Sequence, residues 1–278
     1  MKAITETLGV ARSNIAERVK GTRTPRGPQL REGDLELAVE IRRLVDERPT
    51  YGYRRITALL KRQRPAGSGI NHKRVHRLMK KHGLLLARHT GRRRQQAHDG
   101  KVVTLHSNVR WCSDALEFTC WNDEIIRIAF AMDCHDREVI AWTATMAGIS
   151  GELIRDLTIA CVERRFGAIR TPHPIQWLSD NGSVYAAVKT IELATALGLV
   201  PCFTPIESPE SNGIAEAFVK TFKRDYVRVN PIPDAATALA AVGKWMADYN
   251  EVHPHSRLGY RSPSAYRRAM SQPAACPV

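Results

Sequence analysis

The spacing of apolar residues changes near residue 108, which divides the chain into a helical part and a part that combines strands with helices. Before residue 108, apolar side chains recur every three or four positions, and this predicts helices over residues 34–47, from residue 51 onwards, and over residues 72–82. Asp34 and Asn71 are placed to cap the first and third helices, and Gly83 to close the third. Residues 1–20 predict two shorter helical stretches around Gly9, an incomplete helix-turn-helix unit.

The second part begins with alternating apolar positions, which predict strands over residues 111–119, 125–133 and 138–145 in hairpin order. The elements predicted after them are a helix over 152–166, a strand over 175–179, a helix over 186–197, a strand over 199–204, and helices over 212–229 and 234–250. This order is that of the ribonuclease H-like α/β fold. The predicted fold class is therefore α/β, with a ribonuclease H-like core preceded by a small all-α helix-turn-helix region.

These changes of pattern also predict the domain boundaries. The predicted units are a partial helix-turn-helix and linker (1–30), a helical DNA-binding domain (31–86), a basic linker (87–107), the ribonuclease H-like catalytic core (108–232), and a C-terminal helix and tail (233–278).

Charge is distributed unevenly between the two parts. Residues 1–100 carry 24 Lys and Arg against 9 Asp and Glu, a net charge of +15, whereas residues 101–278 carry 18 against 19, a net charge of −1. A basic part joined to a near-neutral part indicates an arm that binds a polyanion, although a solvated basic surface is the alternative. Nucleic-acid contacts are predicted at Lys73, Arg74, Arg77, Arg54, Arg55, Arg92, Arg93 and Arg94.

Membrane and disulfide functions have little support in the sequence. No apolar run reaches 18 residues, and the first six residues lack the apolar core of a signal peptide. The six cysteines form no C-x-x-C pair and no zinc-finger spacing, which is typical of free thiols in a reducing cytoplasm. We therefore expect a cytoplasmic protein without a membrane partner.

Three acidic residues occupy positions that suit metal-assisted chemistry. Asp114 interrupts the apolar first strand, Asp180 ends the fourth strand before an Asn-Gly turn, and Glu216 lies in the first turns of the long helix. An unpaired charge inside a strand is costly, and cleavage of a phosphodiester by two metal ions needs several converging carboxylates. Magnesium prefers such hard oxygen ligands.

The long helix separates an apolar face from a charged one. At about 100° per residue, Phe218 and Phe222 share a face with Ile214, and a stripe of charged residues lies opposite. That stripe consists of Glu216, Lys220 and Lys223. It predicts a metal ligand with phosphate-binding ammonium groups beside it; the alternative is a solvated Glu–Lys pair. Two other acids, Asp133 and Asp136, are expected to make local hydrogen bonds in a hairpin turn.

Six short segments resemble blocks of one family, and two of them, 51–55 and 71–79, belong to a single block. Trp111–Asp114, Ser179–Ser183 and Ser208–Glu216, with 35 residues between Asp180 and Glu216, resemble the D,D-35-E signature of retroviral integrases and OrfB-type insertion-sequence transposases. The block 249–263 resembles that group's C-terminal signature, and the blocks 51–55 and 71–79 resemble its upstream helix-turn-helix. The resemblance covers roughly residues 35–265.

The resemblance implies a DNA transposase with an integrase-type core. Asp114, Asp180 and Glu216 would hold two Mg²⁺ ions, which Mn²⁺ could replace, and the enzyme would nick an element end and join its 3′-hydroxyl to other DNA. Lys220 and Lys223 would contact the DNA end. The implied partners are double-stranded DNA (terminal inverted repeats and target), further copies of the chain on DNA, and an upstream helix-turn-helix protein joined by frameshifting. The implied location is the bacterial nucleoid.

Two departures and three alternatives accompany this interpretation. Leu116 stands where many relatives carry a hydroxyl residue, and no His-His-Cys-Cys zinc domain precedes the core. The alternatives are a ribonuclease H-like nuclease that cuts without joining, a non-catalytic DNA-binding regulator, and an inactive transposase.

Overall fold

The computed structural model describes residues 2–11, 15, 19, 31–65, 70–87, 104–204 and 213–271. Helix α1 (Lys2–Leu8) ends at Gly9, whose positive φ of 58° is a conformation that glycine adopts without strain. The second helical stretch predicted in residues 1–20 and the arginines 92–94 lie outside the described residues, apart from two single helical positions.

Three helices form a small domain with its own apolar core. They are α3 (Asp34–Glu47), α4 (Tyr53–Arg62) and α5 (His72–Lys81). Their shared core includes Ile41, Ile56, Leu60, Val75 and Met79, all fully buried. Fully burying one such side chain contributes about 1.5–3 kcal/mol, so a domain this small depends on all three helices packing together.

The predicted caps of this domain differ in outcome. Asn71 caps α5 as expected, because its side chain accepts a hydrogen bond from the backbone N–H of Lys73 at 2.9 Å. The cap predicted at Asp34 is wrong: Gly33 occupies that position, and Asp34 is the first helical residue. Its buried carboxylate instead accepts hydrogen bonds from Arg74 and Arg77 of α5, so the ion pairs between helices override the local cap.

A mixed five-stranded sheet forms the centre of the second domain, in the order β3-β2-β1-β4-β5. The strands are β1 (Arg110–Thr119), β2 (Ile125–Asp133), β3 (Val139–Thr145), β4 (Ile175–Ser179) and β5 (Leu199–Phe203). β1, β2 and β3 pair antiparallel, whereas β4 runs parallel to both β1 and β5. This arrangement confirms the predicted ribonuclease H-like fold class.

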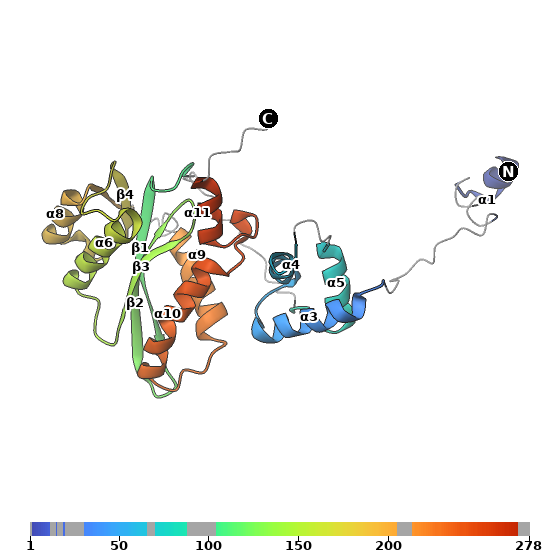
Figure 1. Ribbon diagram of the computed structural model, residues 1–278, viewed down its shortest axis with the longest axis horizontal. Helices are drawn as coiled ribbons and strands as arrows, with labels where there is room; N and C mark the ends of the chain where they lie inside the picture. Colours follow the sequence, from blue (N-terminus) through green and yellow to red (C-terminus); the bar gives the residue numbers. More distant parts are fainter. Residues whose placement is uncertain are drawn as a thin grey trace.

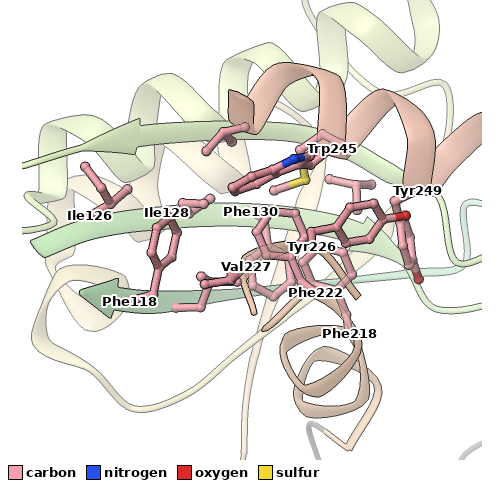
Figure 2. Close-up of a cluster of buried hydrophobic side chains, with 14 of the residues drawn as sticks. Phe118, Ile126, Ile128, Phe130, Phe218, Phe222, Tyr226, Val227, Trp245 and Tyr249 are labelled. Carbon is pink, nitrogen blue, oxygen red and sulfur yellow. The ribbon is translucent and has the colours of Figure 1, made fainter. Parts of the chain in front are cut away.

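Helices cover both faces of the sheet (Figure 1). One face carries α6 (Gly151–Phe166), α7 (Ser183–Ala186) and α8 (Val188–Ala196); the other carries α9 (Gly213–Phe222) and α10 (Ala235–Glu251). Side chains of β1 alternate between them: Trp111 packs with the first group, and Cys112 and Leu116 with the second. Figure 2 shows the core between the sheet and the helices α9 and α10. In it, the ring centroids of Phe130 and Phe218 are 4.5 Å apart.

Two predicted helices differ from the structure. The helix expected over 186–197 begins two residues later, as α8, because the backbone of Ala187 is extended; the short helix α7 before it was not predicted. The helix expected over 212–229 changes at Lys223 into a π-helical turn, η2 (Lys223–Val227). This turn buries three consecutive residues, Asp225, Tyr226 and Val227. An α-helix advances about 100° per residue and therefore does not place three consecutive residues on one face.

The tail folds back along the core. After α10 come the 3-10 turn η3 (Ser256–Leu258) and α11 (Pro263–Ser271), which packs against α10. In the described part of the chain, no helix combines the length and apolar character needed to cross a lipid bilayer.

Candidate active site

The register of the sheet brings Asp114 and Asp180 to the same level. β1 and β4 are parallel neighbours in which Cys112 is paired with Leu178. Asp114 and Asp180 each lie two residues beyond this pair in the same direction, so the side-chain alternation that Cys112 begins directs Asp114 to the face covered by α9. Asp114 therefore lies within β1, and Asp180 directly follows the carboxyl end of its parallel neighbour β4.

Glu216 reaches this region from α9, which packs on the same face. Ala215, Phe218 and Phe222 are the buried residues of α9, whereas Ile214 is only partly buried. The packing face is therefore centred closer to Ala215 than to Ile214, contrary to the sequence-based expectation. Glu216 then flanks the packed face, and its side chain is 43% exposed.

The charges of Asp180 and Glu216 act on the carboxyl group of Asp114. The pKa of Asp114 is raised to about 6, first by burial and then by the charges of Asp180 and Glu216. A hydrogen bond from the backbone N–H of Ala115 at 2.8 Å opposes the rise. Burial away from water and repulsion by like charges thus both raise the pKa of Asp114.

The side chains are not yet gathered at metal-ligand distance. Among the described residues, no three His, Cys, Asp or Glu side chains form a group that could already hold a metal ion. Glu216 instead accepts a hydrogen bond from Lys220 at 3.0 Å, and Asp180 accepts one from the backbone N–H of Gly182 at 3.1 Å. The donor set is nevertheless of one chemical kind, hard carboxylate oxygen, which suits Mg²⁺ or Mn²⁺.

The turn after β4 holds Asp180 in place. A Cβ atom added at Gly182 would lie 3.0 Å from Oδ1 of Asp180, so a larger residue there would require the carboxylate to shift by a few tenths of an ångström. The side-chain amide of Asn181 donates to the carbonyl of Thr204 at 2.8 Å and ties this turn to the end of β5. Asn181 and Gly182 therefore help to fix the position of the Asp180 carboxylate.

A buried hydroxyl pair supports the strand that carries Asp114, and sequence reasoning missed it. The hydroxyl of Tyr185 lies 2.9 Å from Oγ of Ser113, which also donates to the carbonyl of Phe130. Burial raises the pKa of Tyr185, and the nearby Asp114 and Asp180 charges add to the effect. Tyr185 thus stays neutral beneath the acidic site. The only sequence signal was its position just after the Asp180 block.

The basic residues predicted to contact DNA fall into two groups. Lys73 and Arg54 are exposed on the helical domain. Others have partners within the chain: Arg74 and Arg77 pair with Asp34, Arg55 pairs with Asp225, and Lys220 pairs with Glu216. Lys223 is partly buried in η2, and the arginines 92–94 lie outside the described residues. DNA contact by each of these residues stays a prediction.

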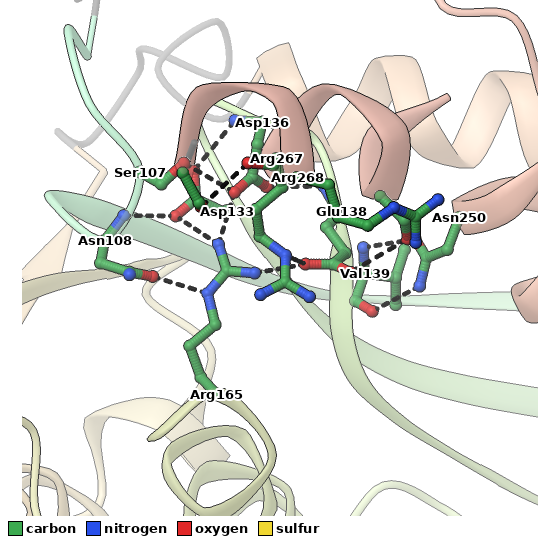
Figure 3. A network of polar contacts seen from close by, with 12 residues as sticks. Ser107, Asn108, Asp133, Asp136, Glu138, Val139, Arg165, Asn250, Arg267 and Arg268 are labelled. Atoms are coloured by element: carbon green, nitrogen blue, oxygen red, sulfur yellow. Dashed lines mark hydrogen bonds and ion pairs between the residues drawn. The ribbon is translucent and has the colours of Figure 1, made fainter. Parts of the chain in front are cut away.

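The competing acids Asp133 and Asp136 belong to a separate buried network (Figure 3). Asp133 accepts the local hydrogen bond expected of a turn, from the backbone N–H of His135 at 2.7 Å. Both carboxylates also pair with Arg165 of α6, at 3.2 and 2.5 Å, and Glu138 pairs with the same guanidinium. Arg165, which was not singled out in the sequence, satisfies these charges and fastens the turn between β2 and β3 to α6.

Three protein-family models together match most of the described chain. An HTH-like domain matches residues 32–94, and two models described as Integrase core domain match residues 105–209 and 198–263. The matches cover both the helical domain and the sheet with its helices.

Individual relatives agree with these matches. The chain is 48% identical over 238 residues to the transposase InsD for insertion element IS2 of Escherichia coli, covering 84% of this chain and 79% of that protein. It is 57% identical over 194 residues to an uncharacterized protein of insertion element IS136 from Agrobacterium fabrum, covering 69% of this chain and all of the relative. A chain in the simian T-cell lymphotropic virus intasome complexed with PP2A regulatory subunit B56 gamma shares the fold at 16% identity, with a TM-score of 0.51 over 86% of this chain and 77% of that chain. The chain therefore belongs to the insertion-sequence transposases, polynucleotidyl transferases that carry out DNA transposition.

Proposed function

We propose that the chain is a transposase of the D,D-35-E class in which Asp114, Asp180 and Glu216 bind two Mg²⁺ ions. The observation that carries the proposal is the parallel pairing of β1 and β4: Asp114 lies two residues beyond the Cys112–Leu178 pair, Asp180 directly follows the end of β4, and Glu216 lies on α9, which packs on the face that includes Cys112. The raised pKa of Asp114, caused by burial and then by both other acids, supports their proximity. Divalent cations would offset this repulsion and draw the carboxylates together.

When bound, the metal ions would activate water or a 3′-hydroxyl and stabilise the attacking and leaving oxygens of the phosphodiester. The residues of this chain would bind the metal ions and set their positions. Asp114, whose pKa is raised to about 6, would bind a metal ion in its ionised form. The carboxylate of Glu216 would contact a metal ion in place of the ammonium group of Lys220. Because Lys220 is 75% exposed, its ammonium can then turn to a DNA phosphate next to the site.

The substrate that fits this account is double-stranded DNA, with the terminal inverted repeats of the element as donor and other DNA as target. The exposed basic residues of the helical domain would bind the end of the element. Joining two ends requires at least two copies of the chain on DNA. A fusion with an upstream helix-turn-helix protein would add further contacts to the repeats.

A strand-transfer assay tests this proposal. Purified protein is incubated with labelled element-end DNA and a target plasmid in Mg²⁺, together with the variants Asp180→Asn and Asp123→Asn. Asp123 is an exposed turn residue with a φ of 67°, a conformation that Asn also adopts, so it is a matched control for the same chemical change. Joined product from wild type and Asp123→Asn, with none from Asp180→Asn, is expected.

Two other results would contradict the proposal. Joining by Asp180→Asn at the wild-type rate would remove Asp180 from the site. Nicked product without any joined product, from wild type on several end sequences, would favour the nuclease alternative.

A further inference from the structure

The helical domain and the core meet at a polar joint whose contacts connect residues 170 to 202 positions apart. The joint consists of Arg48, Tyr51, Arg55 and Arg62 on the helical side and Asp225, Asp248, Val252, His253 and Tyr260 on the core side. Arg48 donates two hydrogen bonds to Asp248, at 2.8 and 2.5 Å. Arg55 pairs with Asp225 at 2.9 Å, and the hydroxyl of Tyr51 lies 2.9 Å from Nδ1 of His253.

The centre of the joint is closed to solvent. The side chains of Asp225 and His253 are each 1% exposed, and Tyr51 is equally buried. Although burial alone would raise the pKa of Asp225, hydrogen bonds from Arg224 and Thr50 and the charge of Arg55 hold it below its usual value. A buried carboxylate that is charged needs its partners in place, so the joint differs from the exposed ion pairs that form and break on a surface.

Both ends of α4 are fastened to the core. Arg55 lies in the first turn of α4, and Arg62, at its last residue, donates to the carbonyl oxygens of Val252 and Tyr260 at 2.6 and 3.0 Å. Two attachment points separated by the length of a helix fix its direction as well as its distance. Since α4 packs directly on α5, the basic helix α5 is held with it.

On the core side, the joint continues directly into the helix of the candidate site. Asp225 lies nine residues after Glu216. It belongs to the π-helical turn η2, which directly continues α9. The hydroxyl of the next residue, Tyr226, donates to Asp248 at 2.9 Å and connects η2 to α10. The π-helical turn allows Asp225 to face the helical domain while Tyr226 and Val227 remain in the core.

Two sequence blocks that the proposed chemistry does not use meet in this joint. The block 51–55 supplies Tyr51 and Arg55, and the C-terminal block that begins at Tyr249 supplies His253. The rings of Tyr249 and His253 are stacked with their centroids 5.3 Å apart, which holds the imidazole toward Tyr51. The blocks are thus two halves of one contact.

We propose that this joint positions the basic helix α5 relative to the site formed by β1, β4 and α9, and so determines which phosphodiester of a bound element end enters the site. The inference rests on the proposed function. Arg48, Arg55, Asp225 and Asp248 act in it as positioning residues, because they contact one another and not the candidate metal ligands. A tether alone would hold the two domains on one chain but would not select a bond.

Charge reversal of one pair tests the proposal. The variants are Arg48→Asp, Asp248→Arg and the double reversal, in which Tyr226 can accept a hydrogen bond from Arg at position 248. The control is Arg43→Asp in α3, the helix that Arg48 directly follows; Arg43 pairs with Glu47 in a contact between 52% and 51% exposed side chains. Three quantities are measured: affinity for end DNA, joining rate at saturating DNA, and the position of the nick on a denaturing gel.

Each single reversal should bind end DNA within about twofold of wild type but join at least tenfold more slowly at saturating DNA. Its remaining nicks should spread over neighbouring phosphodiesters. The double reversal should restore both rate and position, and the control should resemble wild type. Tyr51→Phe, which removes one hydroxyl and preserves the packing, should also broaden the nick position. Wild-type rate and position in the single reversals would overturn the proposal, as would a loss that the double reversal does not restore.

A measurement without DNA separates this inference from the proposed function. Solution X-ray scattering of the full chain should give a larger radius of gyration for each single reversal than for wild type, the double reversal and Arg43→Asp. If wild type joins no DNA but the single reversals expand, the proposed function fails while the joint stands. If wild type joins DNA and the single reversals neither expand nor misplace the nick, the joint is not a positioning device.

Discussion

Nζ of Lys220 lies 3.0 Å from the carboxylate of Glu216, one helical turn away on α9. The side chain of Lys220 is 75% exposed and that of Glu216 is 43% exposed, so this pair contributes only tenths of a kcal/mol to the helix. A divalent cation can therefore displace the ammonium at little cost. In the proposed function, the ammonium group of Lys220 offsets the repulsion between Glu216 and the other two carboxylates until a metal ion binds.

Removing Lys220 should separate metal binding from DNA binding. Lys220→Ala eliminates a positive charge beside the site, so Mn²⁺ should bind about two- to threefold more tightly, while affinity for end DNA should fall by a similar factor. Calorimetric titration with Mn²⁺ and a mobility-shift assay measure the two effects. Weaker Mn²⁺ binding in this variant would show that Lys220 supports the site in another way.

The raised pKa of Asp114 predicts how stability depends on pH. Burial and the charges of Asp180 and Glu216 raise this pKa to about 6 from 3.8, so the folded state favours the protonated form. The stabilisation from that proton is complete below about pH 4 and is lost as the pH rises through about 6. Above pH 7, ionised Asp114 therefore opposes folding in the absence of metal.

Asp114→Asn should remove this pH effect. In EDTA at pH 8, the variant should be more stable than wild type by about 1–3 kcal/mol in urea unfolding, and the difference should disappear near pH 4. Saturating Mg²⁺ should reverse the order at pH 8 by stabilising only the wild type. An equal difference at both pH values would mean that Asp114 carries no raised pKa.

The Arg165 network should be the most sensitive polar site for stability. Arg165→Met leaves Asp133, Asp136 and Glu138 without their common partner in the interior, and the free energy of unfolding should fall by about 3–5 kcal/mol. Arg43→Ala, which removes an exposed pair, should cost less than about 1 kcal/mol. Urea unfolding at pH 7 compares them; similar small losses in both would contradict the structural role of Arg165.

The basic helical domain predicts binding that weakens steeply with salt. Each phosphate contact adds about −0.9 to the slope of log affinity against log salt concentration. Lys73→Ala, at an exposed position of α5, should make the slope less steep by about one contact. Lys189→Ala, at an exposed position of α8 in the core, should leave the slope unchanged. A flat salt response of the wild type would exclude a phosphate-binding arm.

Sequence periodicity predicted most of the fold because the strands have strong apolar patterns. β2 and β4 begin and end at the predicted residues, and the hairpin order of β1 to β3 is confirmed. The breaks at Ala187 and Lys223 could not be predicted, since neither position carries Pro or Gly and both breaks depend on tertiary packing. The same applies to Asp34, where an ion pair with α5 prevails over a local cap.

The three acids of the candidate site could be proposed from the sequence, whereas the contacts that support them could not. Asp114, Asp180 and Glu216 could be selected from strand position and spacing, and β1 and β4, which carry or precede the first two, are parallel neighbours. The Tyr185–Ser113 contact and the Arg55–Asp225 pair join residues 72 and 170 positions apart. No local pattern encodes such contacts, so only the folded chain shows that the two domains share a closed joint.

The most direct test of the account is a change of metal preference at Asp180. Asp180→Cys replaces a hard oxygen ligand with a soft sulfur ligand at an exposed strand end. If Asp180 binds the catalytic metal, this variant should join DNA at less than about one-hundredth of the wild-type rate in Mg²⁺ and regain at least tenfold in Mn²⁺ or Cd²⁺, which accept sulfur more readily. Joining in Mg²⁺ at the wild-type rate, or the same deficit with every metal, would contradict the assignment of Asp180 as a metal ligand.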